Sequence, residues 1–318
     1  MKDPPRYRDL PLDQSMPPRS AWGLWGKDDE LGTLNLLGTE QVQRGMQSVR
    51  SHKVFSLNWK LEEPNPPFYG RGAIQHHPFP NEVGFDDSYD SFYPQSSTQW
   101  DALGHVEHPE YGFYNGRKRE DMAAANGARN GMHNYARKGI VGRGVLLDVA
   151  RYLASQGQPI DGSQRRDFTV ADLEATRQAA GITYETGDIL VIRSGWMNWY
   201  ESADAQTRAT LADDSINLLK TPGISGGEDM AEYLWDSHVA AVASDCPAVE
   251  AWPHELKVDS YLHFRLIPLL GMALGEMWYL EQLADECAKD RCYSFMLVSA
   301  PLNKFGGVGS PANVLAIK

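Results

Sequence analysis

The stretch SSTQWDALGHVEHPEYGFYNG, residues 96–116, places one carboxylate and two imidazoles within eight residues: Asp101, His105 and His108. An acid four residues before a histidine can bind a metal ion, can orient a general base, or can lie in a solvated loop without a chemical role. The surrounding residues are rich in aromatics and glycine, a composition typical of a pocket wall. Asp101 and His105 are therefore candidates to share one ion or one water molecule.

A second candidate lies in the apolar segment LHFRLIPLLGMALGEMWYL, residues 262–280, which contains one histidine, His263, and one glutamate, Glu276. A buried, unpaired glutamate is costly, so Glu276 needs a cation or strong hydrogen-bond donors. One interpretation is a salt bridge from Arg265 to Glu276, with His263 at the surface. The other is a metal site of nitrogen and oxygen ligands that also includes Asp101. The local sequence does not choose between them.

Two candidate nucleophiles have weaker support from their neighbours. GISGG, residues 223–227, matches the G-x-S-x-G elbow around Ser225, but an elbow requires a strand that runs directly into the serine. The preceding LLKTPG predicts no such strand and favours a glycine-rich loop before the helix that holds Glu228. Cys246 is one of three cysteines without a C-x-x-C pair, which favours a buried, inert thiol.

Strands and helices alternate along the segments that must position these residues. Strands are predicted in KVFSLNWKL (53–61), at 145–148, in DILVIRSG (188–195), in HVAAVASD (238–245) and in YSFMLVSAPL (293–302). A helix is predicted after Thr169, with Asp172 completing the capping box and Gly181 as the stop. Helical patterns also occur at 229–237, 261–271 and 279–290. This mixture indicates an α/β or α+β domain.

Composition restricts the classes of partner. A net charge of −12 repels phosphate backbones, and no apolar run is long enough for a membrane helix, so we expect neither nucleic acid nor membrane as a partner. The polar, proline-rich start favours a cytoplasmic protein over a secreted one. We expect an N-terminal arm at residues 1–50, with a short helix from Thr39 to Met46 capped by Thr39, and a single domain at residues 51–318.

The segment at residues 62–87 is rich in proline and is predicted to be a long loop, of a kind that often forms a lid or an oligomer contact. It contains His76 and His77, which we expect to be solvated because adjacent histidines on a loop seldom bind a ligand together.

These motifs together resemble the metal-dependent cyclase family of hydrolases, which includes bacterial kynurenine formamidase and isatin hydrolase. The family signature is H-x-G-T-H-x-D-x-x-x-H, followed much later by a histidine and a glutamate. QSSTQWDALGH, residues 95–105, matches it at Thr98, Asp101 and His105, and the later pair falls on His263 and Glu276. The resemblance extends from about residue 22 to about residue 302. It implies a swivelling β/β/α domain, an α/β fold that usually assembles as dimers or tetramers.

The resemblance also implies a ligand set, with departures from the family pattern. Its metal ligands would fall on Gln99, Asp101, His105, His263 and Glu276, and His105 would be either a ligand or the catalytic base. Gln95 and Gln99 replace the first two histidines of the signature. Because an amide oxygen is a harder and weaker ligand than imidazole, these changes favour one divalent metal, Mn²⁺ or Zn²⁺, with a preference for Mn²⁺.

The implied activity is hydrolysis of a carbonyl C–N or C–O bond in a cyclic or aryl amide, imide or lactone, by a metal-activated water with His105 as general base. The nearby aromatic side chains suit an aromatic or cyclic small-molecule substrate, although they suit a protein core equally well: Trp100, Tyr111, Phe113 and Tyr114. Two alternatives stay open, a metal-dependent cyclase or dehydratase, and a non-catalytic small-molecule-binding protein with a decayed site.

Overall fold

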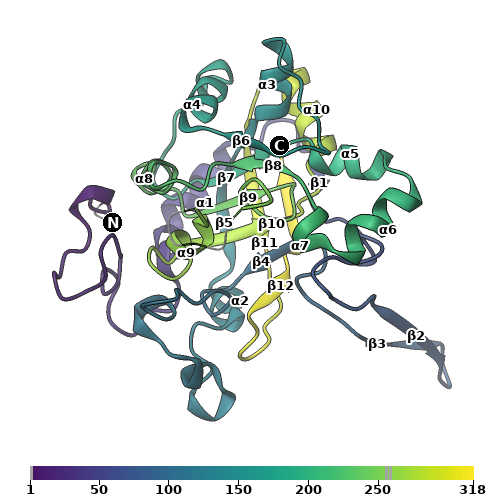
Figure 1. Ribbon diagram of the computed structural model, residues 1–318, viewed down its shortest axis with the longest axis horizontal. Coiled ribbons are helices and arrows are strands. Elements are labelled where there is room, and N and C mark those ends of the chain that lie inside the picture. The colour runs from purple at the N-terminus through teal and green to yellow at the C-terminus, as the bar shows by residue number, and fades with distance from the viewer. Residues whose placement is uncertain (1–2, 255–256, 258–259) are drawn as a thin grey trace.

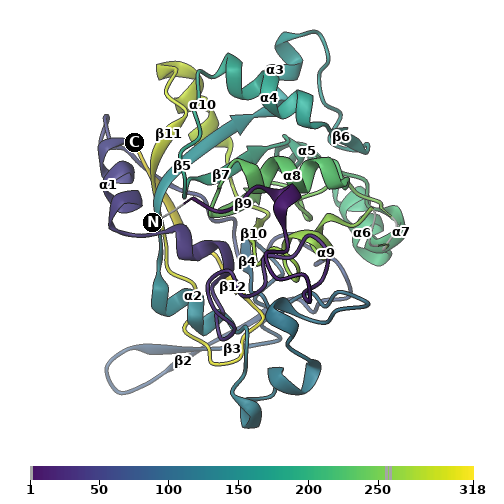
Figure 2. The ribbon, with the colours of Figure 1, turned by 90° about the vertical axis from the view of Figure 1, so that its left-hand side faces the viewer.

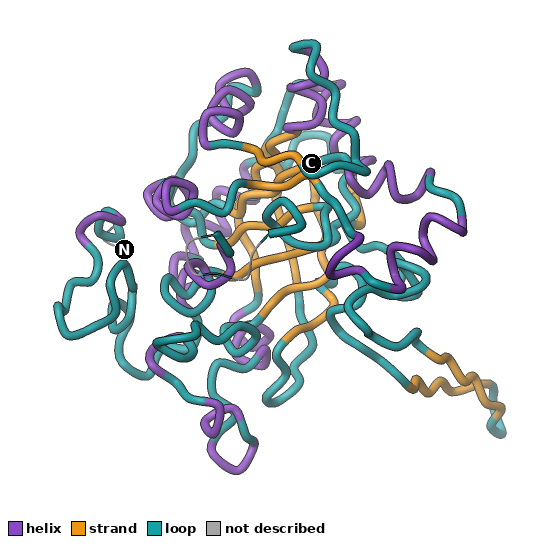
Figure 3. Tube along the Cα trace, viewed as in Figure 1, coloured by secondary structure: helices purple, strands orange, loops and turns teal. Residues whose placement is uncertain are grey.

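A curled sheet of nine strands forms the centre of the protein, and most helices lie around it (Figures 1 and 3). The computed structural model describes residues 3–254, 257 and 260–318. In spatial order the strands are β1 (Val54–Ser56), β13 (Val314–Ile317), β11 (Ser294–Ser299), β5 (Ile140–Asp148), β7 (Ile189–Arg193), β9 (Ala241–Ser244), β10 (Ala273–Glu276), β4 (Gln99–Asp101) and β12 (Gly309–Pro311). The predicted α/β fold class is confirmed.

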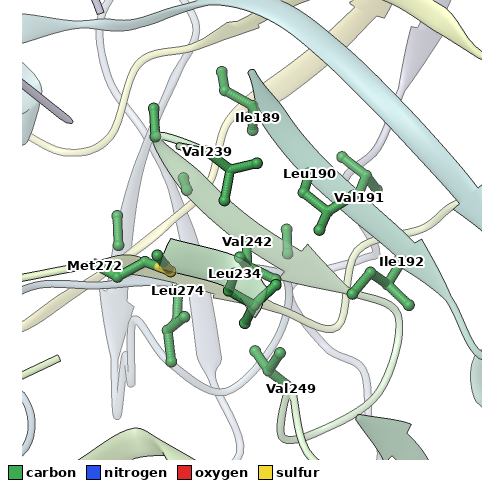
Figure 4. Close-up of a cluster of buried hydrophobic side chains, with 14 of the residues drawn as sticks. Ile189, Leu190, Val191, Ile192, Leu234, Val239, Val242, Val249, Met272 and Leu274 are labelled. Atoms are coloured by element: carbon green, nitrogen blue, oxygen red, sulfur yellow. The ribbon is translucent and has the colours of Figure 1, made fainter. Parts of the chain in front are cut away.

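Four neighbouring strands, β5, β7, β9 and β10, run parallel, whereas the strands toward both edges are antiparallel. The parallel strands are continuous apolar runs because both of their faces are covered. Figure 4 shows part of this core, where side chains of β7 meet Leu234, Val242 and Leu274. The strands predicted at residues 188–195, 238–245 and 293–302 are confirmed within shorter bounds, and the one predicted at 145–148 is the end of the longer strand β5.

The helices connect these strands and cover the sheet (Figure 2). They are α1 (Thr39–Gln47), α2 (Met132–Lys138), α3 (Val149–Ser155), α4 (Val170–Ala179), α5 (Trp196–Ser202), α6 (Ala205–Asp213), α7 (Ser215–Leu218), α8 (Glu228–Asp236), α9 (Leu262–Leu266) and α10 (Glu281–Asp290). The capping box of α4 is as predicted: the backbone N–H of Asp172 donates to the Thr169 hydroxyl, and that of Thr169 donates to the Asp172 carboxylate. In α1 the N-cap is Gly38, so the prediction of Thr39 was wrong by one residue.

Three sequence expectations need correction. KVFSLNWKL forms a strand only at β1, residues 54–56. The helical pattern at residues 261–271 forms a helix only at α9, residues 262–266, and the strand β10 follows in a stretch for which no element was predicted. A short strand, β8 (Pro222–Ile224), does run into Ser225, but it pairs with β6 (Arg166–Phe168) in a separate two-stranded sheet. The buried Ser225 hydroxyl has no hydrogen-bond partner among the described residues, so none of them is placed to act as its base.

The residues before α1 pack along the body of the same chain. The backbone N–H of Tyr7 donates to Asp236 (2.7 Å), and the indole of Trp235 donates to the carbonyl of Pro5 (2.8 Å). The Thr33 hydroxyl donates to the carbonyl of Ala240 beside β9. This segment therefore covers α8 and one end of the central strands.

Part of the segment predicted to be a loop forms a hairpin of β2 (Gln75–Pro80) and β3 (Phe85–Asp90), which projects away from the body (Figures 1 and 2). Every residue of both strands is exposed. No helix in the described part of the chain has the length and apolarity that crossing a membrane requires.

Candidate metal centre

Strand pairing brings three polar side chains to one face of the sheet. In β4 the side chains of Gln99 and Asp101 point to the same face, because alternate residues of a strand do so. β10 pairs antiparallel with β4 and sets Glu276 opposite Gln99 and Leu274 opposite Asp101. Directly opposite residues share a face. The sheet therefore places Glu276 beside Gln99 and diagonal to Asp101, all three buried.

His263, from α9, completes the cluster. Its Nε2 lies 3.1 Å from Oε1 of Glu276 and 3.9 Å from Oδ2 of Asp101. One potential ligand atom from each of these three residues lies within 4.8 Å of the others. His263 is only 2% exposed, so the interpretation that placed it at the surface was wrong.

Two buried oxygen atoms of this cluster have no hydrogen-bond partner among the described residues: Oδ2 of Asp101 and Oε1 of Gln99. An unsatisfied buried carboxylate oxygen costs free energy, and a cation would remove that cost. The available donors are carboxylate and amide oxygens and one imidazole nitrogen, a set that suits a divalent ion. The residues present therefore fit a metal ion held by Asp101, His263 and Glu276, with Gln99 able to contribute an oxygen.

A third buried acid, Glu250, orients the histidine and was missed by sequence reasoning. Its carboxylate lies 2.7 Å from Nδ1 of His263 and also accepts from the backbone N–H of that residue (3.2 Å). A carboxylate on one ring nitrogen of a metal-binding histidine fixes the ring and leaves the other nitrogen for the ion. The signal in the sequence was a lone glutamate, in DCPAVE, directly after a buried strand.

The electrostatics of the cluster favour a positive charge at its centre. Burial lowers the pKa of His263, but the carboxylates of Glu250 and Glu276 outweigh this effect and hold the pKa well above its usual value. Burial and the negative charge of Asp101 raise the pKa of Glu276 to about 7, although His263 opposes that shift. The carboxylates are therefore crowded in a site with little water, where a cation would relieve their repulsion.

Gln95 connects this cluster to His105. Its Nε2 donates to Oδ1 of Asp101 (2.9 Å) and to Nδ1 of His105 (2.9 Å). The Nε2 atom of His105 lies 3.8 Å from Oδ1 of Asp101, and its side chain is 28% exposed, at the rim of the buried cluster. Burial lowers the pKa of His105, against the attraction of Asp101, so the ring is neutral near pH 7. The structure thus brings all five predicted ligands together, with His105 outside the three whose ligand atoms converge.

Some aromatic residues belong to the hydrophobic core, and others lie beside the buried cluster. Trp100 and Tyr114 are fully buried and belong to the hydrophobic core. An aromatic group that sequence reasoning missed lies closer to the cluster. The Tyr261 ring stacks on His263 (centroids 4.8 Å apart), and His254 stacks on Tyr261 (4.4 Å). Burial, with the charge of nearby Glu276, raises the pKa of Tyr69, whose buried hydroxyl has no partner among the described residues.

Comparison with known proteins identifies the family of this chain. The cyclase family model matches residues 45–251, about two thirds of the sequence. The chain belongs to the cyclase family. The matched range includes Gln99, Asp101 and His105 and ends before His263 and Glu276. The resemblance inferred from the motif is therefore confirmed. No curated protein matches the chain significantly.

Solved structures extend the match over nearly the whole chain. A structure described as a novel cyclase is 32% identical, with a TM-score of 0.82 over 94% of this cyclase-family chain and 97% of that one. Isatin hydrolase A from Labrenzia aggregata, bound to benzyl benzoate, is 15% identical, with a TM-score of 0.58 over 85% and 94%. Isatin hydrolase A from Ralstonia solanacearum is 18% identical, with a TM-score of 0.58 over 83% and 91%. At such identities the two hydrolases show a shared fold.

Proposed function

We propose that this cyclase-family protein is a metal-dependent hydrolase that cleaves a carbonyl C–N or C–O bond in a cyclic or aryl amide, imide or lactone. The observation that supports it most is the convergence of Asp101, His263 and Glu276, with an unsatisfied oxygen on Asp101. A divalent ion bound there would supply Lewis acidity, which lowers the pKa of water and polarises a carbonyl.

His105 has the position and the protonation state of a general base in this proposal. Gln95 Nε2 donates to Nδ1 of His105 and lies 3.3 Å from its Nε2, so it holds the neutral ring beside Asp101. In this proposal the unprotonated ring nitrogen exchanges Gln95 for the attacking water, accepts a proton from it and returns that proton to the leaving nitrogen or oxygen. Glu250 keeps His263 oriented throughout.

We also propose an aromatic or cyclic small molecule as the substrate. The stacked rings of His254, Tyr261 and His263 make the surroundings of the cluster aromatic, and the protonated hydroxyl of Tyr69 is an unused donor. For assembly we propose a homo-oligomer, a dimer or tetramer, since an isolated two-stranded hairpin such as β2–β3 is marginally stable in water without a partner surface.

The test begins with metal content. Protein purified without a metal-affinity column is analysed by plasma mass spectrometry, stripped with chelator, reloaded with Mn²⁺ or Zn²⁺, and assayed against cyclic amides, imides and lactones. We expect hydrolysis that disappears on chelation and returns on reloading, with one oxygen atom from ¹⁸O-labelled water in the product. Reaction without uptake of label would favour a cyclase or dehydratase. Failure to bind either metal would leave a non-catalytic binding protein.

A further inference from the structure

We propose that Gln95 and Gln99 act as amide caps that restrict this centre to a single ion, each by occupying the outer oxygen of one carboxylate. This inference rests on the metal-dependent function proposed above. It concerns the number of ions that the chain can hold and the residues that set that number.

Gln95 caps Asp101. Its amide nitrogen donates one hydrogen to Oδ1 of Asp101 and the other to Nδ1 of His105, so both of its hydrogens are used. The position of this side chain is fixed by its surroundings. Gly309 pairs with Asp101 across β12 and β4, and a Cβ added to Gly309 would lie only 2.2 Å from Cγ of Gln95. The backbone carbonyl of Gln95 also accepts a hydrogen bond from the guanidinium of Arg71.

Gln99 caps Glu276 in the same way. Its amide nitrogen donates to Oε2 of Glu276 (2.5 Å), directly across the β4–β10 pair. The backbone carbonyl of Gln99 accepts from the indole of Trp278 (3.1 Å). Once the nitrogen faces Glu276, the remaining polar atom of the side chain is Oε1, which is buried and has no partner among the described residues. Gln99 can therefore cap one ligand and supply a neutral oxygen to the ion.

The uncapped atoms form one ligand set. They are Oδ2 of Asp101, Oε1 of Glu276 and Nε2 of His263, and the last two lie 3.1 Å apart. A two-metal site holds its ions about 3.5–4 Å apart. A carboxylate that bridges them in the bidentate mode gives one oxygen to each ion. In this chain the second oxygen of each carboxylate faces amide hydrogens, whose partial positive charge repels a cation.

The experiment measures stoichiometry without turnover. Metal-stripped full-length chain is titrated with Mn²⁺ alone, and bound metal is measured by equilibrium dialysis with elemental analysis and by electron paramagnetic resonance. The test variant is Gln95→His/Gln99→His, which removes both caps and supplies imidazole ligands. The matched control is Gln206→His on α6, which adds a histidine far from the cluster in sequence and on an exposed surface.

We expect one Mn²⁺ per chain, with an uncoupled six-line signal, in the wild type and in Gln206→His. The double variant should bind about two ions per chain and show the signal of an exchange-coupled pair. Two coupled ions in the wild type would overturn the inference and leave the metal-dependent function standing. A folded double variant that still binds one ion would also overturn it. A wild type that binds no ion would overturn both, and the wild-type result decides even if the double variant does not fold.

Discussion

Histidine and aspartate come together in two regions of this cyclase-family protein, with opposite consequences. On the β2–β3 hairpin, His76 lies 2.6 Å from Asp87 and His77 lies 3.2 Å from Asp90, and all four side chains are about half exposed or more. In the central sheet, the side chains of His263, Asp101 and Glu276 are 3%, 0% and 7% exposed. The residue types are the same, so burial and strand pairing must account for the difference.

On the hairpin, water forms the hydrogen bonds that the neighbouring side chain leaves unmade. An exposed ion pair there contributes about 0–1 kcal/mol to the free energy of unfolding. In the sheet, Oδ2 of Asp101 is buried and has no hydrogen-bond partner among the described residues, and Asp101 is held by the pairing of β4 with β10 and β12. A metal site is thus indicated by buried ligand atoms that lack a partner, and proximity of histidine to aspartate is insufficient.

The difference between the two regions is tested most directly by removing one acid from each. Asp101→Ala deletes the carboxylate that the buried cluster depends on, so we expect bound metal and hydrolysis to fall to background. Asp87→Ala, the matched change on the hairpin, should leave both at wild-type values. Elemental analysis of the two purified variants checks this. Metal retained by Asp101→Ala would show that the ion binds elsewhere.

Removal of His105 should separate the loss of turnover from the loss of bound metal. Since His105 lies at the rim and outside the three converging ligands, His105→Ala should keep its metal while turnover falls by about 10²–10⁴, the usual contribution of a general base. His76→Ala on the hairpin is the control and should be fully active. If His105→Ala loses metal to the same extent as Asp101→Ala, then His105 is a ligand.

A smaller effect is expected from the acid behind His263. Glu250→Gln keeps the shape of the side chain but removes the charge that holds Nδ1 of His263, so metal affinity should weaken about 10–100-fold. Asp90→Asn, which removes the charge beside His77, should have no effect on affinity. Competition with a fluorescent chelator gives both dissociation constants. Equal affinities for Glu250→Gln and wild type would mean that packing alone orients the ring.

The sequence predicted the candidate metal ligands better than the residues that hold those ligands in place. The parallel core strands were predictable because their apolar runs are continuous. Asp101, His263 and Glu276 were singled out as polar residues in apolar or aromatic surroundings, and the family motif then joined them. Glu250 was not predicted, because its role depends on tertiary contact with His263. The pairing of Gln99 with Glu276, 177 residues apart, is set by strand order, which no local pattern reveals.

The hairpin escaped prediction for a different reason. Pro78 and Pro80 lie in β2, and proline normally argues against a strand because it lacks a donor N–H. In an isolated two-stranded ribbon only one edge of each strand is paired, so proline is tolerated where its missing donor would face solvent. The rule that proline argues against a strand applies to strands inside larger sheets, where both edges are paired.

The smallest expected effect concerns stability, where the same two regions should again differ. Leu274→Ala in β10 opens a cavity in the core and should lower the free energy of unfolding by about 2–5 kcal/mol. Phe85→Ser on the hairpin, where the side chain is 73% exposed, should change it by no more than about 0.5 kcal/mol in dilute protein. Denaturant unfolding at two protein concentrations measures both values. A loss above about 1 kcal/mol for Phe85→Ser that appears only at the higher concentration would show that a second copy of the chain covers the hairpin, because only association makes apparent stability depend on protein concentration.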